Sequence, residues 1–269
     1  FAAGVAKSSL AARQIEVDAF DALHLGTTVP SKSSFYGAPW VAAMVGAEGI
    51  TGPMVAQACA TSARVIAGAA SELESGKEDN PAILCITADR TSNGPHILYP
   101  NPKGPGGKGT AEDWVWDNFN HDPFARNAML QTAENLAAEA GITTEEQNEV
   151  ALLRYKQYQA ALADNAAFHK RYMVSPVEIN PSGRKVVGMV ESDEGIFPTT
   201  VAGLEKLKPL LPDGTVTFGG QTFPADGNAG MIVTTPDRVA ELSSNPDIKV
   251  QLISFAQGRA KKGFMPAAN

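Results

Sequence analysis

The chain has 269 residues, of which 43% are hydrophobic and 19% charged, and its formal net charge at pH 7 is −7. This length suits one large domain or two modest ones. The acidic balance argues against a nucleic-acid-binding protein, which would be expected to show a basic domain or stripe. No apolar run reaches the length of a membrane span and no signal peptide opens the chain, so we expect a soluble, cytoplasmic protein. The two cysteines, Cys59 and Cys85, fit a reducing compartment better than a disulfide scaffold.

The first 90 residues alternate between strand and helix patterns. A short strand is predicted at residues 21–25, and apolar and small residues then recur at helical spacing over residues 36–47. A helix of very small residues follows at 63–70. Residues 82–87 form a continuous apolar run, which is typical of a strand buried on both faces. The alternation predicts an α/β fold with helices packed on a sheet.

Cys59 lies at the start of the small-residue helix. A thiol on the first turn of a helix lies near exposed backbone N–H groups and the positive end of the helix dipole, which favour the thiolate. A helix of small residues can also be buried deeply, which would place the sulfur at the bottom of a cleft. Two interpretations follow from these residues: a covalent nucleophile, or an inert core cysteine, since free cysteines are among the most buried residues.

The composition changes after residue 90. Proline, glycine and asparagine crowd residues 91–110, and the stretch 101–109 is predicted to be irregular. Two amphipathic helices are predicted next, one over residues 126–140 and one that begins after Thr143. The second has the Thr-x-x-Glu spacing of a capping box. A short strand at 186–190 and a short helix at 201–207 complete this mainly helical part.

The sheet pattern returns near the end of the chain. We predict a buried strand at residues 229–235, a helix at 236–242 with proline in its first turn, and a further strand at 249–255. A lone terminal strand leaves N–H and C=O groups unpaired and an apolar face uncovered, so we expect another segment or chain to complete the sheet.

Three sets of segments resemble the thiolase family, which comprises acetyl-CoA acetyltransferases and 3-ketoacyl-CoA thiolases. They are residues 59–62 with 87–90, residues 132–137 with 141–147, and residues 204–209 with 213–217 and 226–227. They stand in family order along nearly the whole chain. The resemblance implies a thiolase-like layered fold, with helices packed on a mixed sheet and an inserted, mainly helical loop domain.

The resemblance also implies a division into domains. Residues 1–90 would be the first part of the N-terminal thiolase domain, 91–224 the inserted CoA-binding loop domain, and 225–247 the return to the N-terminal domain. Residues 248–269 would begin the C-terminal domain, the remainder of which is absent. The family's Asn-Glu motif, Gly-His-Pro motif and second catalytic cysteine have no counterpart here. A homodimer or homotetramer is implied, or a second subunit that supplies the missing half.

The family's chemistry assigns Cys59 as the acyl acceptor. It implies an acyltransferase of fatty acid metabolism that cleaves a 3-ketoacyl-CoA thiolytically, or runs the reverse Claisen condensation, with CoA as co-substrate, no permanently bound cofactor and no metal. Met129, Phe218 and Thr222 match family positions along the acyl and pantetheine chains. Each has a plainer interpretation: Met129 as helix core, Phe218 as packing and Thr222 as a turn residue.

Departures from the family pattern cluster around the expected acyl pocket. Thr61-Ser62 replaces the usual Ser-Gly, Ala128 replaces a histidine, and Ala225 replaces an asparagine. They suggest a bulky or aromatic acyl chain in place of the acetoacetyl group. Two alternatives remain open. A related condensing enzyme is disfavoured by the long helical insertion, and a non-catalytic thiolase-fold subunit that binds CoA or a partner protein is favoured by the missing half.

Overall fold

The computed structural model describes residues 1–76, 81–180, 183–222, 225–245 and 247–265. The chain forms two compact units. The first comprises Phe1–Val115 and Pro224–Gln257, and the second Trp116–Phe223 and Gly258–Asn269. The predicted domain boundaries at residues 90, 224 and 247 stay predictions.

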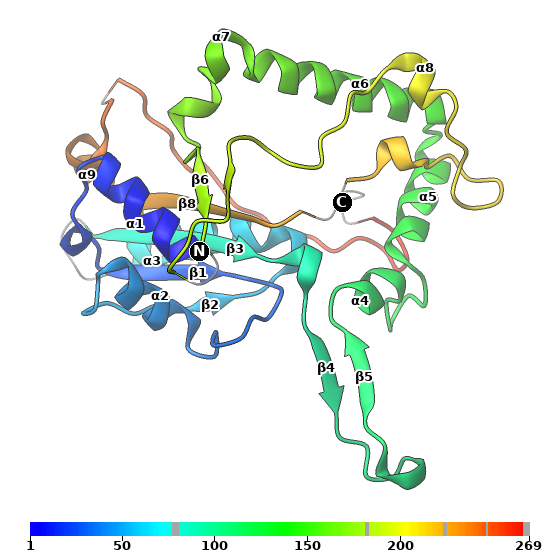
Figure 1. The fold of residues 1–269 in the computed structure, drawn as a ribbon, viewed down its shortest axis with the longest axis horizontal. Helices are drawn as coiled ribbons and strands as arrows, with labels where there is room; N and C mark the ends of the chain where they lie inside the picture. Colours follow the sequence, from blue (N-terminus) through cyan, green and yellow to red (C-terminus); the bar gives the residue numbers. More distant parts are fainter. Residues whose placement is uncertain (77–80, 181–182, 223–224, 246, 266–269) are drawn as a thin grey trace. The chain divides into compact units, whose positions relative to one another are not determined.

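The first unit is built on a four-stranded mixed sheet with the order β2-β1-β3-β8 (Figure 1). Strand β1 is parallel to β2 and β3, and β8 is antiparallel to β3. The elements of this unit are α1 (Ala2–Ala12), β1 (Ala22–Gly26), α2 (Gly37–Val45), β2 (Met54–Val55), α3 (Thr61–Ser75), β3 (Ala82–Asp89), β4 (His96–Tyr99), β5 (Thr110–Asp113), β8 (Gly227–Thr234) and α9 (Pro236–Leu242).

Helices cover both faces of this sheet, which confirms the predicted layering. One core joins Leu23 and Leu25 of β1 to Leu10 of α1 and Val45 of α2. On the opposite face, a second core joins Cys85 of β3 and its neighbours to α3. All five residues of β1 and the first five of β3 are buried. A strand with helices on both sides must be apolar on both, which explains the continuous apolar run over residues 82–87.

The glycine-rich stretch after residue 90 contains a hairpin that the sequence did not predict. Strands β4 and β5 pair antiparallel, with Tyr99 opposite Thr110. Residues 101–109 form the irregular connection, as predicted, and Gly106 and Gly107 adopt positive φ angles of 65° and 69° in it. Only glycine does so without steric cost, so this composition belongs to the tip of the hairpin.

The second unit is mainly helical. Its elements are α4 (Trp116–Asn120), α5 (Met129–Ala140), α6 (Thr144–Ala161), α7 (Ala163–Ala166), β6 (Val177–Ile179), β7 (Gly188–Val190) and α8 (Val201–Leu204). Both amphipathic-helix predictions match helices, and α5 ends at Gly141 in the left-handed conformation.

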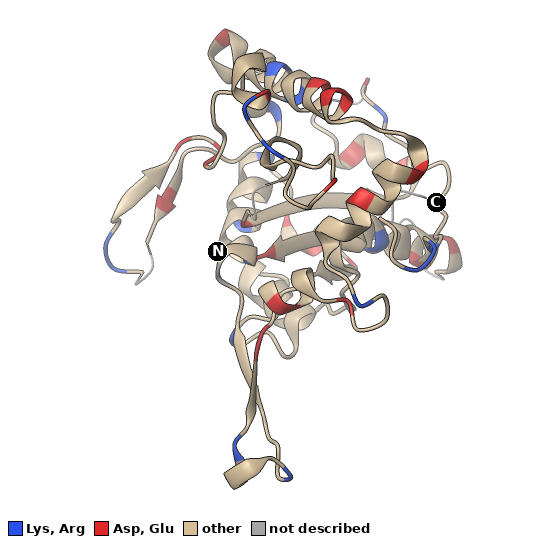
Figure 2. Ribbon diagram, turned by 90° about the vertical axis from the view of Figure 1, so that its right-hand side faces the viewer, with Lys and Arg blue, Asp and Glu red and all other residues tan. Residues whose placement is uncertain are grey.

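The capping box at the start of α6 is confirmed. The Thr143 hydroxyl accepts a hydrogen bond from the Glu146 N–H at 3.2 Å, and the Glu146 carboxylate accepts one from the Thr143 N–H at 2.9 Å. The prediction that this helix has a buried face is wrong: in the part of the chain that the structure describes, no residue of α6 is buried. Acidic and basic residues lie along its length (Figure 2).

The predicted strand at residues 249–255 is wrong. These residues form no strand in the structure, and Val250 is 90% exposed. An apolar run becomes a strand only when a neighbouring strand takes up its N–H and C=O groups, and the described residues supply none to this segment. Among the residues that the structure describes, no helix is both long and apolar enough to cross a membrane.

Candidate active site

Cys59 lies in a short 3-10 turn, Ala58–Ala60, that leads directly into α3. The thiol therefore stands two residues before the first residue of the helix, and its side chain is exposed. Ala58, immediately before it, has a φ of +44°. This left-handed backbone is unfavourable for a residue with a β-carbon, and such strain is concentrated at functional sites.

The hydroxyl of Thr61 closes this turn. Its oxygen accepts a hydrogen bond from the Gln57 N–H at 2.8 Å and donates one to the Ala58 carbonyl at 2.7 Å. Thr61 itself is buried. The side chain that departs from the family pattern at this position thus holds both residues that precede Cys59 along the chain.

Gly26 lets the start of α3 approach the end of β1. A β-carbon on Gly26 would lie 2.8 Å from side-chain carbons of Thr61, Val65 and Thr87. Such a distance is well inside ordinary contact between carbon atoms. Gly26 directly follows the strand predicted at residues 21–25, and a glycine at the end of a buried strand is a signal of such a close approach, although the sequence did not single it out as a site residue.

Cys85 is the core cysteine of this chain. It is 3% exposed, lies in β3 opposite His24 of β1, and packs among the residues beneath α3. Burial raises the pKa of its thiol to about 12. A thiol that is both covered and neutral is a poor nucleophile, so the two cysteines differ sharply in their surroundings.

The other predicted site residues belong to the second unit. Met129 is the first residue of α5 and is half-buried. Phe218 begins the short turn Phe218–Gly220 and is 69% exposed, and Thr222 is also exposed. The turn that contains Phe218 packs against α6. Cys59 lies in the first unit and these three residues in the second, and their roles stay predictions.

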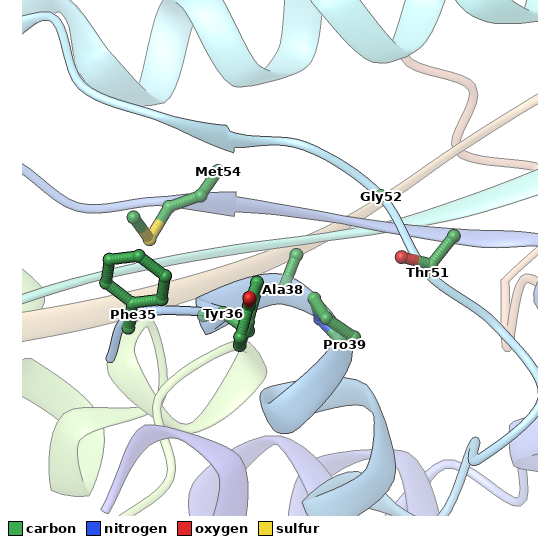
Figure 3. A pocket seen from close by; sticks show the side chains of 8 residues that line it. Phe35, Tyr36, Ala38, Pro39, Thr51, Gly52 and Met54 are labelled. Atoms are coloured by element: carbon green, nitrogen blue, oxygen red, sulfur yellow. The ribbon is translucent and has the colours of Figure 1, made fainter. Parts of the chain in front are cut away.

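A cavity of about 290 Å³ lies in the first unit between the start of α2 and the edge strand β2 (Figure 3). Phe35, Tyr36, Pro39 and Met54 are among its lining residues. None of the predicted site residues lines it. Within the ranges that the structure describes, no cluster of three or more His, Cys, Asp or Glu side chains could hold a metal ion.

Comparison with known proteins gives consistent matches. The family model "Thiolase, N-terminal domain" matches residues 1–237. The mitochondrial 3-ketoacyl-CoA thiolase of Homo sapiens is 28% identical over 247 residues, which cover 90% of this chain and 60% of that protein. The cytosolic acetyl-CoA acetyltransferase of Gibberella zeae is 31% identical over 200 residues, covering 73% of this chain and 48% of its own length.

A solved structure gives the same result at the level of the fold. The crystal structure of the human mitochondrial 3-ketoacyl-CoA thiolase in complex with CoA matches with a TM-score of 0.75 and 27% identity. The match covers 89% of this chain and 59% of that one. The chain thus spans about 60% of the length of the human relative that it matches.

Proposed function

The chain belongs to the thiolase family, and from that premise we propose that it acts as an acyl-CoA acyltransferase whose nucleophile is Cys59. The reaction is thiolytic cleavage of a 3-ketoacyl-CoA, or the Claisen condensation in reverse. The observation that carries this proposal is the exposed thiol on a strained turn at the N-terminus of α3.

In the cleavage direction, the Cys59 thiolate attacks the 3-keto carbon of the substrate. The bond between carbons 2 and 3 breaks, its electron pair leaves as the acetyl-CoA enolate, and that enolate takes up a proton. The acyl group remains on Cys59 as a thioester. The thiolate of a second CoA then attacks this thioester, releases the shortened acyl-CoA and regenerates the Cys59 thiolate.

The start of α3 presents first-turn N–H groups that have no partner within the helix. Backbone N–H donors directed at a developing oxyanion are worth about 3–4 kcal/mol each in comparable enzymes. We assign the proton transfers to groups outside this chain, in the part of the thiolase fold that it does not span.

We further propose that the second unit binds CoA as a co-substrate. Met129, Phe218 and Thr222 would line the acyl and pantetheine chains, and the exposure of Phe218 and Thr222 leaves both side chains free to contact a ligand. The human relative solved with CoA supports this ligand class. Assembly into a homodimer or homotetramer and a cytoplasmic location belong to the same proposal, the latter supported by the cytosolic relative.

The acyl group is proposed to be bulkier than acetoacetyl. Thr61 follows the nucleophile by two residues and Ala128 is the N-cap of the helix that begins with Met129, so two of the departures from the family pattern lie near proposed site residues along the sequence. Replacing a histidine by alanine at position 128 removes a ring and leaves room.

The test combines kinetics with thiol labelling. Thiolysis is followed with acetoacetyl-CoA and with an aromatic 3-ketoacyl-CoA for the native protein, Cys59→Ala and the control Cys85→Ala, each together with the part of the thiolase fold that supplies the proton-transfer groups. We expect turnover to vanish only in Cys59→Ala, to favour the aromatic substrate, and acyl-CoA to slow the alkylation of Cys59 by iodoacetamide. If neither cysteine is protected and no substrate turns over, the chain is a non-catalytic subunit.

A further inference from the structure

Hydrogen bonds connect the turn that contains Cys59 to Asp89, the last residue of β3, by way of Thr28. Thr28 follows β1, and its hydroxyl lies 2.9 Å from the hydroxyl of Thr61 and 3.4 Å from the Ala58 carbonyl. Because Thr61 donates its single proton to the Ala58 carbonyl, its oxygen is left to accept from the Gln57 N–H and from Thr28. The three bonds use the whole capacity of the Thr61 hydroxyl.

Thr28 is itself fixed by Asp89, the last residue of β3. One oxygen of this carboxylate, Oδ1, accepts hydrogen bonds from the Thr28 N–H at 2.8 Å, the Val29 N–H at 2.8 Å and the Thr27 hydroxyl at 3.0 Å. The indole N–H of Trp114 donates to the Thr28 carbonyl at 3.1 Å. Bonds to an ionised acceptor are the stronger kind, so residues 27–29 are anchored firmly to the sheet.

We propose that Asp89 is a positioning residue for Cys59 and acts through the hydroxyls of Thr28 and Thr61. The inference rests on the proposed function only in taking Cys59 as the nucleophile. The chain of contacts runs from the Asp89 carboxylate to Thr28, from Thr28 to Thr61, and from Thr61 to the two residues that precede Cys59.

Strain at Ala58 explains why the turn needs this series of hydrogen bonds. A φ of +44° in a residue with a β-carbon persists only where surrounding contacts over-determine the conformation. When the Thr28 hydroxyl is lost, Thr61 loses one of its three partners and the turn relaxes toward ordinary backbone angles. The Cys59 side chain then loses its fixed position before α3, and its reaction with an electrophile slows.

The test measures the rate of iodoacetamide alkylation at Cys59 in the folded protein, with Cys85 as an internal monitor of opening. Thr28→Val removes the hydroxyl and keeps the shape, and we expect it to slow alkylation by about fivefold, the upper end of what a helix terminus contributes at a surface. Thr28→Ser restores the hydroxyl and should recover the native rate. The matched control Thr27→Val removes a bond to Asp89 that lies off this path and should stay within about twofold of native.

Two variants of Asp89 extend the test. Asp89→Asn keeps an oxygen acceptor and is expected to fall between native and Asp89→Ala. The proposal is overturned if Thr28→Val and Thr27→Val slow labelling equally, or if Thr28→Ser fails to recover it. The ordering of labelling rates without any acyl-CoA turnover would uphold the positioning role and defeat the proposed acyltransferase function.

Discussion

Replacing Gly26 by alanine tests how closely α3 must approach the sheet. The new methyl group would lie 2.8 Å from carbons of Thr61, Val65 and Thr87, about 0.7 Å or more inside the optimal carbon–carbon separation. Overpacking of this kind costs about 1–3 kcal/mol. Loss of backbone freedom in the unfolded chain offsets about 0.4–1 kcal/mol of it. We therefore expect a net loss of about 1–2 kcal/mol in unfolding free energy.

The same substitution should also disturb the nucleophile. Two of the three crowded side chains, Thr61 and Val65, belong to α3, so relief of the overlap moves the start of this helix and the turn before it. Urea unfolding gives the stability change, and iodoacetamide labelling of Cys59 gives the local one. We expect a lower urea midpoint together with slower labelling.

Gly4→Ala is the matched control for this experiment. Gly4 lies within α1, and a β-carbon there would meet nothing within 4 Å. Alanine inside a helix is favoured over glycine by about 0.5–1 kcal/mol, so this variant should be more stable than the native protein. If Gly26→Ala matches the native protein in both urea midpoint and labelling rate, the close approach of α3 has no role in placing Cys59.

Three further substitutions test other parts of the structure. Glu134 is 8% exposed and accepts hydrogen bonds from the Thr215 N–H, the Thr215 hydroxyl and the Val216 N–H, so Glu134→Ala should lower the unfolding free energy in urea by about 3 kcal/mol; a loss below about 1 kcal/mol would contradict this. Thr143→Ala removes the N-cap of α6 and should reduce its helical circular dichroism at a cost of about 1 kcal/mol, whereas an unchanged melting curve would speak against the cap. Burial raises the pKa of Cys85 to about 12, so the unfolding free energy should be highest below pH 9 and should fall as the pH rises toward 12, because only the thiol of the unfolded chain ionises in that window. Urea denaturation at pH 8 and at pH 10.5 should show a smaller fall in unfolding free energy for Cys85→Ala than for the native protein. Equal falls would refute the link between the Cys85 pKa and stability.

The elements that the sequence predicted well carry their signals locally. The buried strand β3 is an unbroken apolar run, and the capping-box residues from Thr143 to Glu146 mark the start of α6. Neither depends on a distant partner for recognition. The same holds for α9, which begins at Pro236 as a helix with proline in its first turn should.

The elements that were predicted wrongly or not at all depend on partners elsewhere in the chain. Residues 249–255 have the composition of a strand but no neighbour to pair with among the described residues. Strands β4 and β5 are each four residues long and find one another only across the loop between them. Composition alone does not reveal such a pairing.

The candidate site divides in the same way. Cys59 could be found from the sequence because a cysteine before a small-residue helix is a local pattern. The contacts from Asp89 to Thr28 and from Thr28 to Thr61 could not, because they join residues 61 and 33 positions apart, and the φ of Ala58 is set by the turn that these contacts hold. The roles of Met129, Phe218 and Thr222 stay predictions that rest on the family resemblance.

Peptide mass mapping after brief incubation with a 3-ketoacyl-CoA, followed by acid quenching, tests whether Cys59 carries the acyl group. We expect the peptide that contains Cys59 to gain the mass of one acyl group, hydroxylamine to remove it, and Cys85 to stay unmodified. An acyl group on Cys85 or on any other residue, with Cys59 unmodified while substrate is consumed, would contradict it.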